Sequence, residues 1–192
     1  MRNFIYCVLA TILLMCCTND NQTKNVEEQL AEILAEIDST NSIIEDLTSH
    51  WEFEFDTDEM TDEQNVFASL ISKNTCELDF PYGETRCTLC IRKMGRRGGI
   101  DAMVLVSSGQ IYGSEYKNDN YILVRFDDET PIKYWYNESA SGSSDVIFIR
   151  KTNDFIEHCK KAKVIKVEVP MFDEGRKLFT FEAKEPFTWK NE

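Results

Sequence analysis

Histidine is scarce in this 192-residue sequence, where only His50 and His158 occur. A hydrolytic site of the Ser-His-Asp or Cys-His type needs a histidine beside its nucleophile. His158 precedes Cys159 on a predicted helix, where neighbouring side chains point about 100° apart, so the two do not form such a pair. The acidic run over residues 52–63 lacks the glycine and the closing glutamate of an EF-hand loop. We therefore predict that the protein is not an enzyme and that it has no cofactor and no metal site.

Positive charge is also in short supply. The chain has 21 Lys and Arg residues against 34 Asp and Glu residues, and its formal net charge is −13. Nucleic-acid binding relies on a basic surface that displaces counterions from phosphates, so we predict no nucleic-acid partner. The same deficit argues against purely electrostatic docking on anionic lipid.

The apolar run from Phe4 to Met15 is too short to span a bilayer, which takes about 20 residues. With Arg2 ahead of it, the run has the size of a signal-peptide core. Residues 14–17 resemble the cleavage box of bacterial lipoprotein signal peptides, which ends in a cysteine. The resemblance implies that residues 1–16 are removed and that Cys17 receives the lipid. Lipid attachment at Cys16, and an ordinary cleaved signal with free cysteines, are the alternatives.

Lipid attachment at Cys17 would also fix where the protein resides. A single acyl chain binds a bilayer only marginally, whereas several chains anchor a protein stably. We therefore expect a lipid-anchored protein of the bacterial cell envelope, held at the outer membrane by its N-terminus.

A polar tether is predicted over residues 17–24 and an amphipathic helix over residues 25–48. Apolar residues in this helix recur at alternating spacings of four and three, which is the a/d pattern of a coiled coil. Two interpretations remain open: self-association through residues 26–47, or packing of the apolar stripe on a protein partner or on the protein's own domain. The seam consists of Val26, Leu30, Ile33, Ile37, Thr40, Ile44 and Leu47.

A β-rich domain is predicted over residues 50–192. Trp51, Phe53 and Phe55 alternate with acidic residues, which is typical of a half-buried strand. Many short strands separated by turn residues favour a mainly β fold, either an antiparallel β-sandwich or an open barrel. One short helix after residue 152 is expected to cover an end or edge of the sheet. Further strands are predicted at 66–72, 76–80, 86–93, 102–107, 121–126, 132–136, 146–150, 164–169 and 178–181.

Four cysteines fall in this domain, in a compartment that permits disulfides. Cys87 and Cys90 match C-x-x-C, but residues three apart on a strand face opposite sides. A hairpin turn centred on residues 82–83 pairs Cys76 with Leu89. In that register Cys76 lies diagonal to Cys87 on the buried face, and Cys90 is exposed. The sequence thus predicts a possible Cys76–Cys87 disulfide, with buried free thiols as the alternative. The four cysteines are Cys76, Cys87, Cys90 and Cys159.

Five groups of short fragments occur in order over residues 51–189. They are Trp51 with Asp58-Glu59-Met60-Thr61; Phe80-Pro81-Tyr82-Gly83 with Leu89-Cys90-Ile91-Arg92; Ser108-Gly109-Gln110; Val124-Arg125-Phe126-Asp127-Asp128; and Phe155-Ile156 with Lys161-Ala162-Lys163, Phe179-Thr180-Phe181 and Trp189. This ordered set resembles uncharacterised exported bacterial lipoproteins and, more distantly, small accessory proteins of type VI secretion. The resemblance implies a β-rich domain without known enzymatic activity, and it supplies no catalytic residues.

These features together predict a membrane-anchored bacterial lipoprotein with a non-catalytic binding or scaffolding role in the cell envelope. Two alternatives stay open. One is a thiol-active envelope protein that uses Cys87 and Cys90, and the other is an accessory component of a secretion system.

Overall fold

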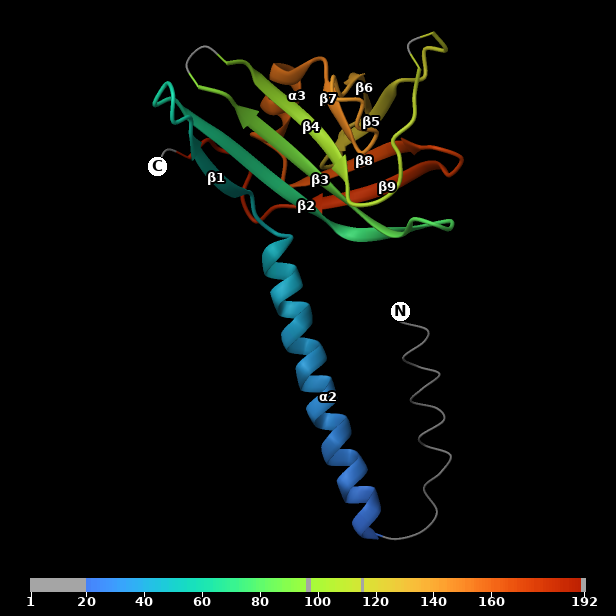
Figure 1. Ribbon diagram of the computed structural model, residues 1–192. Helices are drawn as coiled ribbons and strands as arrows, with labels where there is room; N and C mark the ends of the chain where they lie inside the picture. The colour runs from blue at the N-terminus through green and yellow to red at the C-terminus, as the bar shows by residue number, and fades with distance from the viewer. Residues whose placement is uncertain (1–19, 96–97, 115, 191–192) are drawn as a thin grey trace. The chain divides into compact units, whose positions relative to one another are not determined.

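The computed structural model describes residues 20–95, 98–114 and 116–190 (Figure 1). The chain divides into two compact units, Met1–Ile44 and Glu45–Glu192. The described part of the first unit is helical, and the second unit holds a sheet and a short helix. The predicted signal peptide and the lipid-attachment residue Cys17 lie outside the described residues.

Helix α2 (Asp20–Leu47) is continuous over 28 residues. It begins at Asp20 rather than at residue 25, so the prediction of a non-helical tether is wrong for residues 20–24, and residues 17–19 lie outside the described part. The physical reason is that no proline or glycine separates these polar residues from the seam, so the helix extends back through them. Among the described residues, no helix is long and apolar enough to cross a membrane.

The α2 seam is only partly covered. Leu30 and Ile37 are half-buried, whereas 53% of Ile33 is exposed. Thr40, the polar member of the seam, donates its hydroxyl to the carbonyl of Glu36 at 2.8 Å. The helix therefore satisfies its polar seam residue internally and leaves apolar surface in contact with solvent.

The second unit is built on one antiparallel sheet of nine strands in the order β1-β2-β3-β4-β7-β6-β5-β8-β9. Along several of its strands the side chains alternate between buried and more exposed positions, as expected for a sheet with one packed face. The strands are β1 (Glu52–Thr57), β2 (Gln64–Leu78), β3 (Gly83–Lys93), β4 (Ile100–Val106), β5 (Tyr121–Phe126), β6 (Ile132–Glu138), β7 (Val146–Ile149), β8 (Val164–Met171) and β9 (Gly175–Glu182).

The sheet curls on itself into a half-barrel, which brings β9 alongside β2 (Figure 1). The side chain of Asn74 on β2 joins the two strands, because its amide donates to the carbonyl of Leu178 at 2.9 Å and accepts from the backbone N–H of Thr180 at 2.7 Å. The prediction of a mainly β fold with an N-terminal helix and one short helix is confirmed. Of the two architectures expected, the curled single sheet corresponds to the open barrel.

The short helix α3 (Thr152–Cys159) covers one end of the half-barrel. Phe155 on α3 meets Phe126 and Tyr134 of the sheet with ring centroids 5.7 and 5.5 Å apart. The Tyr134 hydroxyl donates to the Asp154 carboxylate at 2.8 Å. These edge-to-face rings close this end with side chains.

The β2–β3 hairpin differs from its predicted register. The N–H of Tyr82 donates to the carbonyl of Asp79 at 3.0 Å, and Leu78 and Gly83 form the last strand pair. The turn is thus centred on residues 80–81 rather than 82–83. Cys76 consequently pairs with Thr85, not with Leu89. The two predicted strands 66–72 and 76–80 are one strand, β2, whose register shifts between Ile71 and Thr75.

Candidate functional site

The end of the half-barrel opposite α3 is open. Strand β5 runs from Tyr121 at this end to Phe126 beside α3. The residues that precede Tyr121 therefore lie at the opening. The segment over residues 107–120, which joins β4 to β5, is held there by backbone hydrogen bonds. Ile111 donates to the carbonyl of Ser144 at 2.7 Å, and Tyr112 donates to that of Pro170 at 3.0 Å.

A hollow of about 460 Å³ lies at this opening, and we call it the mouth hollow. Such a volume falls within the range of small-ligand sites, about 300 to 1,000 Å³, and the mouths of barrels are frequent places for them. Three segments distant in sequence meet in it: residues 110–114, the β6–β7 connection and the β8–β9 turn. The lining residues are Gln110, Ile111, Tyr112, Gly113, Ser114, Glu138, Ser139, Gly142, Ser143, Ser144, Val146, Ile147 and Phe172.

Two exposed aromatic side chains line the mouth hollow. Tyr112 is 41% exposed and Phe172 is 44% exposed. Their ring centroids are 5.5 Å apart in an edge-to-face arrangement, and the Lys117 ammonium lies 3.4 Å from the Tyr112 hydroxyl. Aromatic pairs of this kind present rigid apolar surface with a polar edge, which suits a ligand that has both an apolar face and polar groups.

Behind the lining lies an unpartnered hydroxyl. The side chain of Tyr136 is buried, and among the described atoms its hydroxyl has no hydrogen-bond partner. Burial, with a smaller contribution from the Asp119 charge, raises the pKa of Tyr136. A Cβ atom at Gly113 would lie 2.2 Å from this hydroxyl. Only glycine therefore allows the wall of the mouth hollow to lie this close to the tyrosine.

The polar lining comes mostly from a serine-rich turn. Ser139 and Ser141 share a hydrogen bond of 2.8 Å between their hydroxyls, and the N–H of Gly142 donates to the Ser139 carbonyl at 3.0 Å. Glu138 pairs across the ladder with the buried Ile147, yet its own side chain is exposed at the strand end. Hydroxyls, a carboxylate and the Gln110 amide thus surround the aromatic pair. This set can donate and accept hydrogen bonds, and the Ser143 hydroxyl in it already donates to the Asp145 carboxylate.

The C-x-x-C cysteines do not form a pair. Cys87 faces the core and is fully buried, whereas Cys90 lies on the other face of β3. The prediction that Cys90 is exposed is wrong, since only 8% of it is accessible where it packs between Ser69 and Met103 of the adjacent strands. Burial raises the pKa of both thiols. A reactive cysteine needs a lowered pKa and access to solvent, so this geometry does not support redox chemistry.

The predicted Cys76–Cys87 disulfide is absent from the structure, in which Cys76, Cys87, Cys90 and Cys159 are all free. Cys76 pairs with Thr85, so it is diagonal to Cys87 in the observed register as it was in the predicted one. The prediction failed on distance. Diagonal neighbours are about 7 to 8 Å apart, which exceeds the Cα separation that disulfides usually bridge. The Cys76 thiol instead lies 3.5 Å from the carbonyl oxygen of Leu178.

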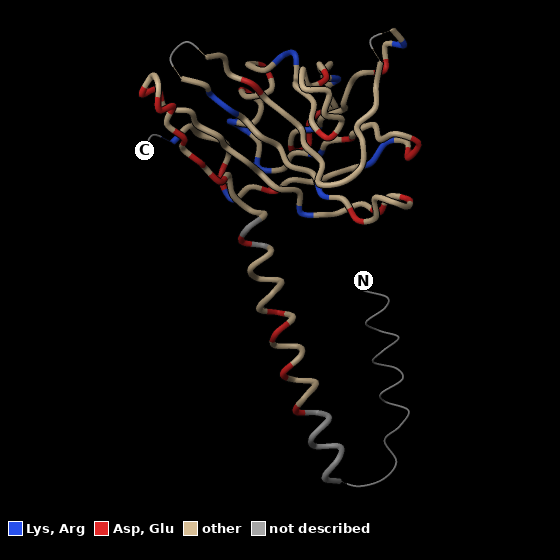
Figure 2. Tube along the Cα trace, in the orientation of Figure 1, with Lys and Arg blue, Asp and Glu red and all other residues tan. Residues whose placement is uncertain are grey.

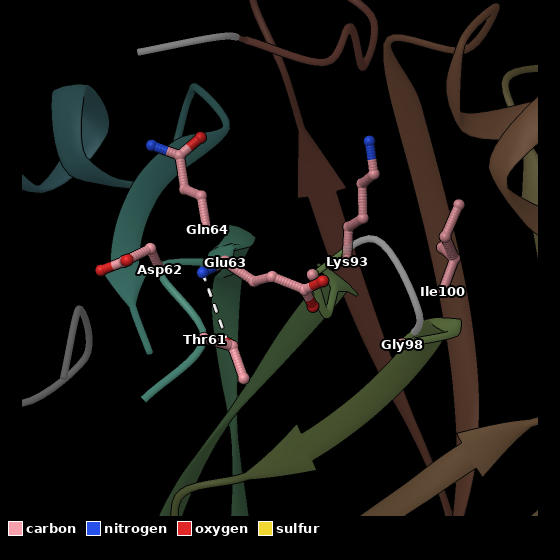
Figure 3. Close-up of a pocket in the computed structure, with 8 residues that line it drawn as sticks. Thr61, Asp62, Glu63, Gln64, Lys93, Gly98 and Ile100 are labelled. Atoms are coloured by element: carbon pink, nitrogen blue, oxygen red, sulfur yellow. Dashed lines mark hydrogen bonds between the residues drawn. The ribbon is translucent and has the colours of Figure 1, made fainter. Parts of the chain in front are cut away.

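A second hollow, of about 810 Å³, lies between the β1–β2 and β3–β4 turns (Figure 3). The Glu63 side chain extends toward the end of β3 that carries Lys93, while Asp62 points away from it. The N–H of Glu63 donates to the Thr61 hydroxyl at 3.4 Å. The β3–β4 turn that borders it includes residues 96–97, which are outside the described part. We therefore take the mouth hollow as the candidate site.

Sequence reasoning did not find the mouth hollow. The only available signals were the serine-rich stretch over residues 139–144 and the fragment that contains Gln110. Neither signal shows that three separate connections meet at one end of a curled sheet. That juxtaposition depends on long-range strand pairing, such as the bridge between Ile111 and Met171.

Comparison of this chain with protein-family models, with curated proteins and with solved structures found no match, so its function is argued from its own residues.

Proposed function

We propose that this protein is a lipid-anchored lipoprotein of the bacterial cell envelope that binds a hydroxyl-rich ligand, such as an oligosaccharide, in the mouth hollow and does not transform it. The binding role rests on one observation above all: a pair of exposed aromatic rings surrounded by hydroxyl, amide and carboxylate groups at the open end of the half-barrel.

The chemistry of the lining supports this class of ligand. A sugar ring has an apolar face of C–H groups, which packs on an aromatic side chain, and hydroxyls at its edge that require hydrogen-bond partners. Tyr112 and Phe172 offer the first kind of surface, and Gln110 and Glu138 offer the second. Ligand sites typically combine apolar surface with a few polar groups that fix orientation.

The anchoring half of the proposal rests on the sequence of residues 1–17. A short apolar run ending in Cys16-Cys17 and followed by polar residues fits an export signal with lipid attachment. The thiol-active alternative is not favoured, since Cys87 and Cys90 are buried on opposite faces of β3.

Saturation-transfer NMR with maltotriose, cellotriose and chitotriose tests the binding role. We expect at least one of these sugars to receive saturation from the full chain, and Tyr112→Ala to abolish the transfer because it removes half of the aromatic pair. Tyr116→Ala is the matched control, since Tyr116 is 95% exposed and does not line the mouth hollow. Failure of all three sugars to bind, or equal loss in both variants, would contradict the proposed ligand class.

A further inference from the structure

The outer face of β5, β6, β8 and β9 carries a group of basic and aromatic side chains. The ladder sets Tyr121 opposite Trp135, Arg125 opposite Lys166, and Arg176 opposite Pro170. The alternate residues Ile122, Val124 and Phe126 are buried in the core, so these partners point outward. We call this group the cationic face: Tyr121, Arg125, Lys133, Trp135, Lys166 and Arg176.

Stacked cations hold the aromatic residues of the cationic face in place. The Lys133 ammonium lies 4.0 Å from the ring centroid of Tyr121, and the Arg176 guanidinium lies 4.6 Å from it. Trp135 meets Tyr121 at 5.6 Å between centroids. Arg176 also forms an ion pair with Glu168 and donates to the backbone carbonyl of Tyr121 at 3.1 Å. Contacts of this kind order long side chains before any partner arrives, which lowers the entropic cost of binding.

The charge of this face is opposite to that of the molecule. Four Lys and Arg residues here outnumber the two outward-facing carboxylates of these strands, Glu168 and Glu182, in a chain whose net charge is −13. Glu182 is paired with Lys73 of β2. Figure 2 shows acidic residues along α2, whereas the basic residues lie largely among the strands. Arg125 lies 3.6 Å from Asp128 in the turn after β5, and its buried Nε has no hydrogen-bond partner in the described part of the chain. Among the described residues, no carboxylate forms an ion pair with Lys133 or Lys166.

Apolar side chains complete the surface. Leu178 on β9 lies opposite Glu168 and is 51% exposed, and Leu123 lies between Lys133 and Glu168 on the neighbouring strands. Tyrosine, tryptophan and arginine around an apolar centre are the residues enriched in protein–protein hot spots.

We propose that the cationic face docks an acidic polypeptide segment that also carries aliphatic residues. The local positive charge suits a short acidic stretch, while the negative charge of the rest of the molecule repels extended polyanions. The apolar residues Leu123 and Leu178 would contact the aliphatic side chains of the partner. This surface is separate from the mouth hollow, so the inference stands apart from the proposed ligand.

The probe is a synthetic peptide that repeats one leucine and three glutamates, titrated into the full chain and followed by isothermal calorimetry. We expect binding that weakens at high salt. The double variant Lys133→Glu/Lys166→Glu should weaken it by about tenfold or more, because each reversal replaces an attraction with a repulsion. Lys151→Glu/Lys161→Glu is the charge-matched control, with its two reversals at exposed residues on either side of α3, and should alter affinity by less than about twofold.

Leu178→Ala, and a probe with alanine in place of leucine, test the apolar half of the proposal, and each should weaken binding. Thermal melts of every variant confirm that the fold persists. The proposal is overturned if the probe does not bind, or if Lys151→Glu/Lys161→Glu weakens binding as much as Lys133→Glu/Lys166→Glu. It is also overturned if inorganic polyphosphate binds as tightly with the same dependence on Lys133 and Lys166.

Discussion

At the scale of single residues, the buried thiols behave as small apolar side chains. Cys87 and Cys159 are fully buried, and desolvation raises the pKa of each thiol well above its ordinary value of 9.0. A thiol in such surroundings stays protonated and packs as a hydrophobic group. The protein therefore uses these cysteines for its core.

This burial predicts a fall in stability at alkaline pH. Below about pH 9 both thiols are protonated in the folded and unfolded chains, so their contribution is fully present. Above it the unfolded chain releases protons that the folded chain retains, and the free energy of unfolding falls by about 1.4 kcal/mol per pH unit for each group. Between about pH 8 and pH 10, the variant Cys87→Ala/Cys159→Ala should lose about 2 to 3 kcal/mol less than the wild type.

Urea unfolding at a series of pH values measures this difference. The comparison uses the slope against pH, so the loss of packing caused by the two alanines does not affect it. Parallel slopes for the wild type and the double variant would show that neither thiol is protected from ionisation in the folded state.

Residue patterns predicted which face of most strands is buried, but not how the strands align. Alternation correctly put Cys87 and Leu89 on the inner face of β3. The register depended on whether the β2–β3 turn is centred on residues 80–81 or 82–83, and both choices keep the same residues facing inward. Periodicity of two cannot separate registers that differ by an even number.

At the scale of elements, the Asn74 side chain forms hydrogen bonds to β9 of the kind that a neighbouring strand would form. It lies in the irregular stretch of β2, and its side-chain amide bonds to two backbone groups of β9 that face away from β8. The Ser72 hydroxyl supports it by donating to the Asn74 carbonyl at 2.8 Å. The free edge of β9 is thereby covered, which protects it from pairing with another chain.

Asn74→Ala should lower the free energy of unfolding by about 1 to 2 kcal/mol. The substitution leaves the Thr180 N–H without its partner and leaves the Leu178 carbonyl with only the weak Cys76 thiol donor. Chemical denaturation measures the loss, and hydrogen exchange should show faster exchange of the Thr180 amide. Asn153→Ala makes the same chemical change at an exposed position on α3 and should stay within about 0.5 kcal/mol of the wild type. Equal effects of the two substitutions would contradict the bridging role.

The α2 helix presents a different element-scale question, which is what covers its seam. Every described charged side chain on α2 is acidic, while Ile33 on the seam is more than half exposed. We propose that a second copy of α2 covers this seam, since apolar residues at a and d positions pack best against each other.

A cysteine placed on the seam tests this proposal. Thr40→Cys should form a disulfide-linked dimer on a non-reducing gel, because seam positions face each other across a coiled coil. Ser42→Cys is an exposed off-seam control and should give no crosslinked band. Adding Ile33→Glu to Thr40→Cys should remove the crosslink, since it buries a charge in the seam. Equal crosslinking of the on-seam and off-seam cysteines would exclude a specific coiled coil.

At the scale of the whole molecule, the sequence allowed the fold class to be predicted but left a sandwich and an open barrel as alternatives. Alternating strands such as β1, and the apolar face of α3, follow from local periodicity. Closure of the half-barrel involves side chains that join β2 to β9, among them the Asn74 amide and Lys73, which pairs with Glu182. The mouth hollow depends on connections far apart in sequence. Such contacts leave no periodic trace, so they required the three-dimensional structure.

The proposed membrane location of the protein also bears on its two proposed binding surfaces. The proposed lipid tether would confine the protein to a membrane surface, where the mouth hollow and the cationic face would meet ligands and partners at high local concentration. If the tether were absent, the proposed role in the cell envelope would lose its basis.

Metabolic labelling with a clickable fatty-acid probe in a bacterial host tests lipid attachment at Cys17. We predict that the wild type and Cys16→Ser incorporate the label, that Cys17→Ser does not, and that the mature wild-type chain begins at residue 17. An unlabelled wild-type protein whose N-terminus is still Met1 would contradict the proposed lipid anchor.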